Sequence, residues 1–82
     1  MNVNIDIEPK RLDIVATGHR IKELMDEKEI AIKELSKFMG VSFQAVYRWQ
    51  KGEALPTIPN LFILGQILDI DVDDILVAKE KE

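Results

Sequence analysis

The stretch from Ile32 to Trp49 reads I-K-E-L-S-K-F-M-G-V-S-F-Q-A-V-Y-R-W. Its first half has the apolar spacing of a helix, because Leu35, Phe38 and Met39 follow one another at i, i+3 and i+4. Gly40 then interrupts the pattern, and glycine commonly ends a helix because it adopts the left-handed conformation at little cost. We therefore expect a short helix that ends at Met39 and buries these three side chains.

A second short helix follows this glycine almost immediately. Ser42 is a good N-cap residue, Val46 and Trp49 lie at i, i+3 and are expected to face the core, and Gly52 is expected to stop the helix after Lys51. Two helices joined by a short glycine-containing turn form a helix-turn-helix, here over residues 32–51. The outward face of its second helix, residues 43–51, has the right width for a DNA major groove.

Size and composition limit the class of protein. The chain has 82 residues, 46% of them hydrophobic, so one small globular domain is expected. It contains no cysteine, which excludes disulfides, zinc fingers and thiol catalysis. The apolar cluster at 61–68 is too short to span a bilayer, and the N-terminus lacks the features of a secretory signal. A cytoplasmic protein is the expectation.

The charge distribution matters more than the total. A net charge of −4 argues against nucleic-acid binding. Residues 31–51, however, carry a net +3, from Lys33, Lys37, Arg48 and Lys51 against Glu34, whereas the residues from Asp69 onward carry a net −4. The local field guides a polyanion more than the total charge does. The sequence therefore predicts a bipolar molecule with its basic end on the helix-turn-helix.

The N-terminal residues show a different periodicity. Residues 2–7 alternate between apolar and polar side chains, a short strand pattern. Such a strand needs a partner, either the helices or a second copy of the chain, and a frayed terminus is an equally good interpretation. We divide the chain into an arm at 1–8, a helix-turn-helix domain at 9–78 and a charged tail at 79–82.

Three more helices complete the expected fold. The first runs from Pro9 or Leu12 to Lys28, with Gly18 weakening its middle. The fourth begins near residue 58 after an N-cap at Thr57, and a last short helix covers residues 72–78 with Asp71 as its cap. The loop residue Leu55 is expected to be buried. The prediction is an all-α fold of five short helices around one core.

The polar face of helix 43–51 has a chemistry suited to DNA. Gln44, Tyr47, Arg48 and Lys51 lie at i, i+3, i+4 and i+7, opposite the inward pair. Glutamine bonds an adenine edge at two points and arginine a guanine edge. Lysine suits a phosphate, tyrosine a phosphate or a thymine methyl, and Ser42 with the helix N-terminus suits another phosphate. An ordinary amphipathic helix with a solvated outer face explains the same pattern equally well.

The ordered set of motifs over residues 21–77 resembles the Cro/repressor-type (XRE-like) helix-turn-helix family. The matching motifs are I-K-E-L, K-E-L-S, G-V-S, A-V-Y-R-W-Q-K-G, L-P, N-L-F-I-L-G-Q-I-L and D-D-I-L-V. This resemblance implies a five-helix lambda-repressor-like domain that binds operator DNA as a repressor-like regulator of transcription, usually as a homodimer. The dimer surface is expected in the N-terminal strand or in residues 75–77.

The resemblance also assigns roles to residues. Gln44 and Arg48 fall on base-reading positions, with Phe43 and Tyr47 beside them, and the expected phosphate contacts are Ser42, Lys51, Lys33 and Lys37. Phe43 either covers a thymine methyl or packs on the domain surface. Ile32 stands where the family often has a phosphate-clamping glutamine, and Lys33 is the substitute that this chain offers.

One pair of positions departs from the family together. The family commonly pairs an arginine in the first helix with a glutamate near the end of the third, whereas this chain has Met25 and Gln50. Losing one partner leaves a charge uncompensated, but replacing both can be neutral. We expect Met25 to pack against the aliphatic part of Gln50.

Other functions find less support. Asp69, Asp71, Asp73 and Glu80 match four EF-hand positions, but Asp74 stands where that loop needs glycine, so caps and helix-end charges explain them better. His19 is the only histidine, and no glycine-rich phosphate loop occurs. We expect no enzyme, no metal and no cofactor. The alternative to a DNA-binding regulator is an antitoxin or adaptor, a protein-interaction module with the same fold.

Overall fold

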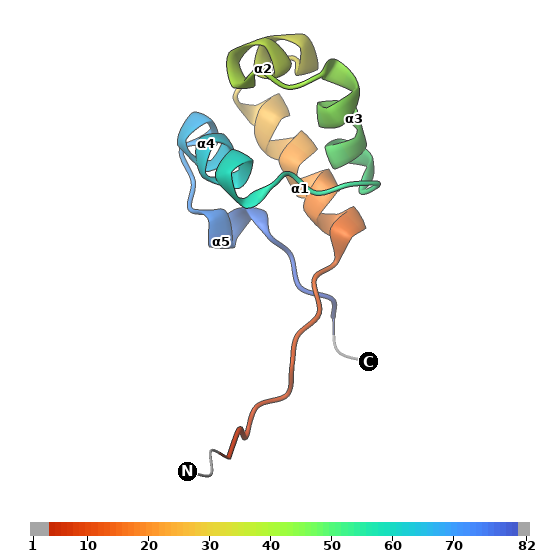
Figure 1. The fold of residues 1–82 in the computed structure, drawn as a ribbon, viewed down its shortest axis with the longest axis vertical. Helices are drawn as coiled ribbons and strands as arrows, with labels where there is room; N and C mark the ends of the chain where they lie inside the picture. The colour runs from red at the N-terminus through yellow and green to blue at the C-terminus, as the bar shows by residue number, and fades with distance from the viewer. Residues whose placement is uncertain (1–3, 81–82) are drawn as a thin grey trace.

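The computed structural model describes residues 4–80 and places five helices in them. These are α1 (Ile14–Glu27), α2 (Ile32–Met39), α3 (Phe43–Lys51), α4 (Ile58–Leu68) and α5 (Val72–Ile75). The all-α prediction is confirmed, but the N-terminal strand is not, because residues 4–7 form no strand and run away from the helices (Figure 1). Residues 2 and 3 of that predicted strand and residues 81 and 82 of the predicted tail lie outside the described residues.

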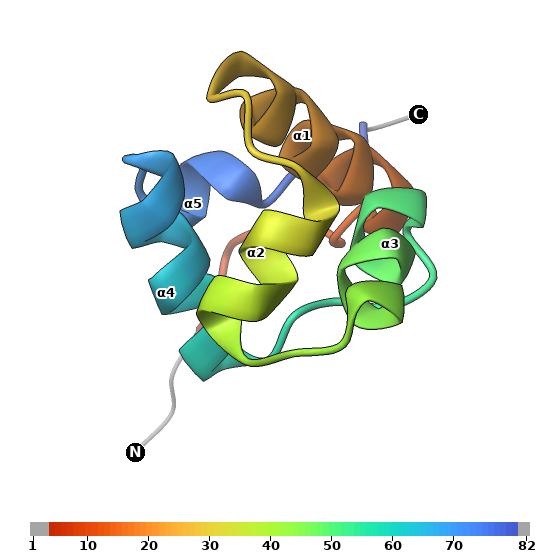
Figure 2. The same ribbon diagram turned by 90° about the horizontal axis from the view of Figure 1, so that it is seen from above.

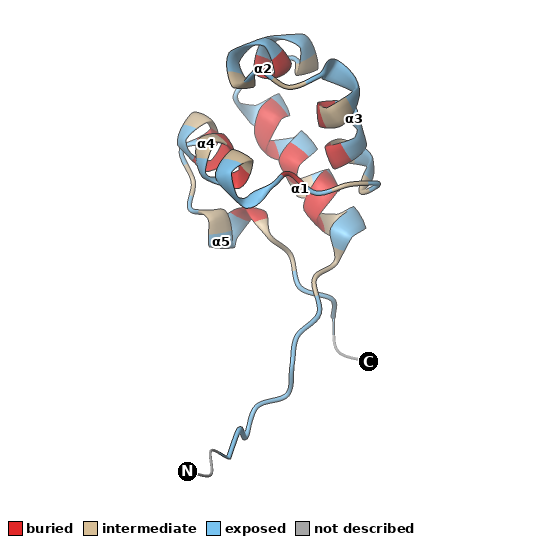
Figure 3. Ribbon diagram, viewed as in Figure 1, coloured by how far each residue is buried: buried red, intermediate tan, exposed pale blue. Residues whose placement is uncertain are grey.

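All five helices contribute to a single core. Each supplies at least one side chain that is 1% exposed or less: Ile21, Met25, Leu35, Val46, Leu64 and Ile75. Figure 3 shows these buried positions on the inner sides of the helices, with exposed residues outside. Burial of this apolar surface is the main force that holds such short helices together.

Local caps fix the helix ends near the turn. The Ser42 hydroxyl accepts a hydrogen bond from the Ala45 N–H at 3.0 Å, and Thr57 does the same for Asn60 at 3.3 Å. Gly40 and Gly52 both adopt the left-handed conformation, with φ of 70° and 73°. These four predictions are confirmed. Asp71 stands at the N-cap position of α5, but its side chain makes no capping hydrogen bond.

The predicted ends of the first and last helices are wrong, and one feature explains both. α1 begins only at Ile14, and α5 ends at Ile75 rather than Ala78. Residues 11–13 lie antiparallel to residues 77–79, where the Asp13 N–H donates to the Val77 carbonyl and the Lys79 N–H to the Arg11 carbonyl, both at 2.8 Å. We call this pairing the clasp. Because it uses these backbone groups, the segments cannot join the neighbouring helices.

Two apolar residues expected in the core lie outside it. Phe38 is 75% exposed, because the inward side of α2 carries Leu35, Ser36 and Met39 and residue 38 falls beside that stripe. Leu55 is 36% exposed, because its neighbours at 54 and 56 face inward in the loop and residue 55 therefore faces outward. Both expectations of burial were wrong.

Two glycines bring α1 and α3 close together. A Cβ atom added at Gly18 would overlap the Trp49 carbonyl oxygen and lie 2.8 Å from that of Gln50. A Cβ at Gly52 would lie 2.6 Å from the Cα of Val15. Figure 2 shows α3 placed against α1 and next to α2. Gly18 is therefore the point of contact that seats α3, and not only a weak position in its own helix.

Candidate nucleic-acid interface

α3 is anchored on one side and open on the other. Val46 is fully buried and Trp49 is 5% exposed, so this side belongs to the core. On the other side, Gln44, Tyr47, Arg48 and Lys51 are all exposed, as their spacing predicted. Phe43 is also 54% exposed. The helix thus presents amide, phenol, guanidinium, ammonium and aromatic groups without competition from core packing.

The start of α3 offers hydrogen-bond donors. The Ser42 hydroxyl is exposed and accepts from the Ala45 N–H, which leaves its own O–H free to donate. The N-terminal end of a helix also carries a partial positive charge. A phosphate oxygen at this point would meet both.

α2 contributes exposed cations, but it lacks the phosphate-binding glutamine that the family often has at the start of this helix. Lys33 and Lys37 are exposed one turn apart. Ile32 is half-buried and packs against the core cluster, so this position is used for packing. The only acid of the segment, Glu34, accepts a hydrogen bond from the Ala31 N–H at 3.1 Å and thereby caps the start of α2.

The cations of α3 have partners that the sequence analysis missed. The Lys51 Nζ lies 5.3 Å from the centre of the Tyr47 ring, within cation–π range. It also lies 3.5 Å from Oε2 of Glu53, and Nε of Arg48 lies 3.9 Å from Oε1 of the same carboxylate. Glu53 directly follows Gly52, the residue predicted to end the helix. Because the chain folds back toward the helix end at such a glycine, this position in the sequence could have indicated that Glu53 lies beside the α3 cations.

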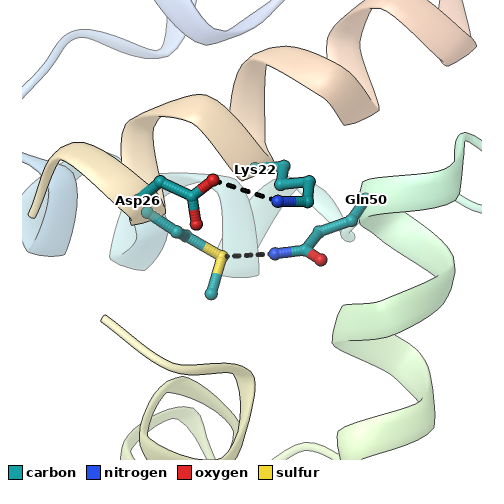
Figure 4. A network of polar contacts seen from close by, with 4 residues as sticks. Lys22, Asp26 and Gln50 are labelled. Carbon is teal, nitrogen blue, oxygen red and sulfur yellow. Dashed lines mark hydrogen bonds and ion pairs between the residues drawn. The ribbon is translucent and has the colours of Figure 1, made fainter. Parts of the chain in front are cut away.

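Met25 and Gln50 are in contact as predicted, but the contact is made by the Gln50 amide and not by its aliphatic part. The Gln50 amide Nε2 donates to Sδ of Met25 at 3.2 Å, and Met25 is only 1% exposed (Figure 4). Beside it on α1, Lys22 pairs with Asp26 at 3.0 Å on the surface. A buried thioether with an amide over it replaces a charged pair without leaving any charge in the interior.

Three aspartates lie away from the basic helices, whereas Glu34 lies in α2 and Glu53 directly follows α3. Asp71, Asp73 and Asp74 are exposed around α5, which Figure 1 shows at the end of the domain opposite α2. The Arg20 Nε donates to the Asp74 carbonyl at 2.8 Å and ties α5 to α1. Within residues 4–80, no three carboxylate or histidine side chains come together as metal ligands would. His19 is exposed on α1.

Comparison with known proteins decides the family. A family model described as Helix-turn-helix matches residues 21–75. The chain belongs to the helix-turn-helix family. The resemblance to its Cro/repressor (XRE) type, expected from the motifs, is thereby confirmed, and this helix-turn-helix protein is a DNA-binding regulator of transcription.

A solved structure supports the assignment. The helix-turn-helix protein is similar to the restriction-modification controller protein C.AhdI from Aeromonas hydrophila, with a TM-score of 0.70 and 25% sequence identity. The match covers 77% of this chain and 96% of that one. No curated protein matches the chain. No helix in residues 4–80 combines the length and the apolar character needed to cross a membrane.

Proposed function

We propose that this protein binds a specific double-stranded DNA sequence through α3 in the major groove and represses transcription by occupying that site. The observation that carries the proposal is the two-sided character of α3: Val46 and Trp49 fix it to the core, while its other side remains exposed. Gln44 reads an adenine edge and Arg48 a guanine edge. Phe43 covers a thymine methyl, and Tyr47 contacts a neighbouring base or phosphate.

The affinity comes from phosphate contacts. Ser42 and Lys51 hold phosphates at the two ends of α3, and Lys33 and Lys37 hold them from α2. The cations assigned to phosphates number three in each subunit, namely Lys33, Lys37 and Lys51. Specific binders use roughly 6–10 phosphate contacts. One subunit falls short of that range and two subunits reach it, so we propose that the protein binds as a homodimer.

The dimer surface lies in the N-terminal arm. The other candidate, residues 75–77, is already used within the subunit, because Ile75 is fully buried and the Val77 N–H donates to the Thr17 hydroxyl at 3.0 Å. In contrast, Ile5 and Ile7 are 77% and 75% exposed. We propose that the arms of two copies pair as antiparallel strands and cover these isoleucines.

The charges on the arm disfavour several registers for this pairing. Centring the pair on Ile5 places Asn4 opposite Asp6 of the second copy. Centring it on Asp6 or on Ile7 places two carboxylates opposite each other, Asp6 against Asp6 or Asp6 against Glu8, which is unfavourable. A register shifted by one residue places isoleucine opposite aspartate. Pairing centred on Ile5 therefore avoids each of these unfavourable contacts.

Replacing Ile5 with aspartate is expected to convert the dimer to a monomer, because it places a charge at the centre of the paired arms. Light scattering after gel filtration measures the change in molar mass. Ile58→Asp is the matched control, since Ile58 is 72% exposed at the start of α4. If Ile58→Asp dissociates the dimer and Ile5→Asp does not, the subunits meet at α4 and not at the arm.

Selection of bound sequences from random DNA tests the function itself. We expect one enriched motif with two-fold symmetry, whose half-sites lie about one helical turn apart, about 34 Å. Binding of that motif across a salt series is expected to give a slope of log K against log salt of about −5, as six phosphate contacts predict. Retention of no fragment at low salt, or retention without an enriched motif, contradicts the proposal.

A further inference from the structure

The α3 cations meet a carboxylate that comes from outside the helix. Gly52 turns the chain back with φ of 73°, and the Glu53 N–H then donates to the Arg48 carbonyl at 3.0 Å. This bond fixes the backbone of Glu53 beside the last turn of α3. The Glu53 side chain is therefore held near Arg48 and Lys51 by the backbone and not only by its charge.

The carboxylate approaches Arg48 from one defined edge. The ion pair joins Oε1 of Glu53 to Nε of Arg48 at 3.9 Å, and the other oxygen, Oε2, lies 3.5 Å from Nζ of Lys51. Guanine recognition uses two parallel hydrogen bonds from the guanidinium fork. A partner at the Nε edge leaves the two terminal nitrogens available for these bonds.

We propose that Glu53 is the specificity-determining positioning residue of the DNA interface, a role that rests on the function proposed above. It holds the Arg48 guanidinium with its terminal nitrogens available to guanine, and it offsets the charge that Lys51 and Arg48 would otherwise offer to any phosphate. The first effect favours the cognate site. The second lowers binding to DNA of every sequence.

The exposure of the three residues suits this role. The side chains of Arg48, Lys51 and Glu53 are between 50% and 60% exposed. Ion pairs at such exposure are weak and yield readily to a stronger partner. The arrangement thus orients the arginine in the free protein and leaves it able to adjust when the base arrives. Removing the carboxylate removes the orientation and adds one effective positive charge to the interface.

The test compares Glu53→Gln with the unchanged protein on three duplexes: the selected site, the same site with the guanine opposite Arg48 replaced, and a random sequence. Glutamine keeps the length and the backbone bond but removes the charge. We expect the random duplex to bind roughly threefold tighter or more at low salt, and the salt slope to steepen by about 0.9 for each subunit. We expect the ratio of cognate to random affinity to fall by about two- to fivefold, since an exposed ion pair contributes at most about 1 kcal/mol.

Two controls separate orientation from charge. Glu23→Gln removes the same charge from the exposed surface of α1 and is expected to leave the ratio unchanged. In an Arg48→Ala background, Glu53→Gln is expected to have no further effect on recognition of the guanine, because the group that it orients is absent. Thermal unfolding of Glu53→Gln is expected to match that of the unchanged protein.

The outcomes distinguish this inference from the function on which it rests. If Glu53→Gln tightens binding to all three duplexes by one common factor, Glu53 acts only as a charge and the positioning role is overturned. If the unchanged protein binds the selected site and the site with the guanine replaced equally well, Arg48 does not recognise that guanine. This result also overturns the positioning role of Glu53. If the unchanged protein binds no duplex at low salt, the proposed function fails first.

Discussion

Replacing Gly18 with alanine is expected to destabilise the domain by about 3 kcal/mol or more, because the added methyl meets backbone atoms that cannot move aside. A Cβ there would overlap the Trp49 carbonyl oxygen and lie 2.8 Å from both the Gln50 carbonyl oxygen and the Gly52 nitrogen. A domain of 82 residues has a total stability of roughly 4–12 kcal/mol. The melting temperature is therefore expected to fall by about 12 °C or more, measured by circular dichroism.

Whether Gly18→Ala lowers or raises the stability of the domain is the strongest test of this close approach. At an unobstructed position inside a helix, glycine to alanine stabilises by roughly 0.5–1 kcal/mol. Gly40→Ala is the matched control, since φ is 70° there and no atom lies within 4 Å of the added Cβ. It isolates the cost of the left-handed conformation, about 1–2 kcal/mol. A Gly18→Ala variant as stable as the unchanged protein would show that α1 and α3 do not approach so closely.

Replacing Arg48 with alanine is expected to weaken binding to the selected site by about 1–3 kcal/mol, a factor of roughly 5–150, and to relax the preference for guanine at one position. The reason is the loss of two hydrogen bonds to one base. Arg48 is exposed and its ion pair with Glu53 lies on the surface, so folding is expected to be unaffected. Fluorescence anisotropy titrations with the selected site and its single-base variants measure both effects.

Lys37→Ala is the control for charge alone. It is expected to weaken binding to cognate and random duplexes about equally and to reduce the salt slope by about 1 per subunit, because it removes a phosphate contact and no base contact. If Arg48→Ala instead behaves like Lys37→Ala, the guanidinium meets a phosphate. If neither variant changes DNA binding, α3 does not face DNA.

The sequence predicted the central helices well because their ends depend on local chemistry. Ser42 and Thr57 cap helices through bonds to residues three positions away, and Gly40 and Gly52 end helices through their own backbone angles. None of these features needs knowledge of distant residues. The same holds for the outward face of α3, which follows from the spacing of Val46 and Trp49.

The errors at the outer helix ends and at Gly18 involve contacts between distant parts of the chain, whereas those at Phe38 and Leu55 concern the direction in which a side chain faces within its own segment. The start of α1 and the end of α5 depend on the clasp, which joins residues more than sixty positions apart. Gly18 was expected only to weaken its helix, because the sequence around it does not indicate that the backbone of Trp49 and Gln50 packs against it. Glu53 lies just beyond the turn that ends α3, so the helical spacing of α3 does not include it. Helical periodicity cannot reveal such contacts.

The clasp has a consequence for how this domain can be joined to other proteins. It holds residues 11–13 beside residues 77–79, and Figure 1 shows the chain leaving the domain from both segments on the side away from α2. A chain that enters and leaves a domain at neighbouring points suits insertion of that domain into a host loop. A reporter or a second domain fused at either end would thus be carried away from α2 and leave its lysines open.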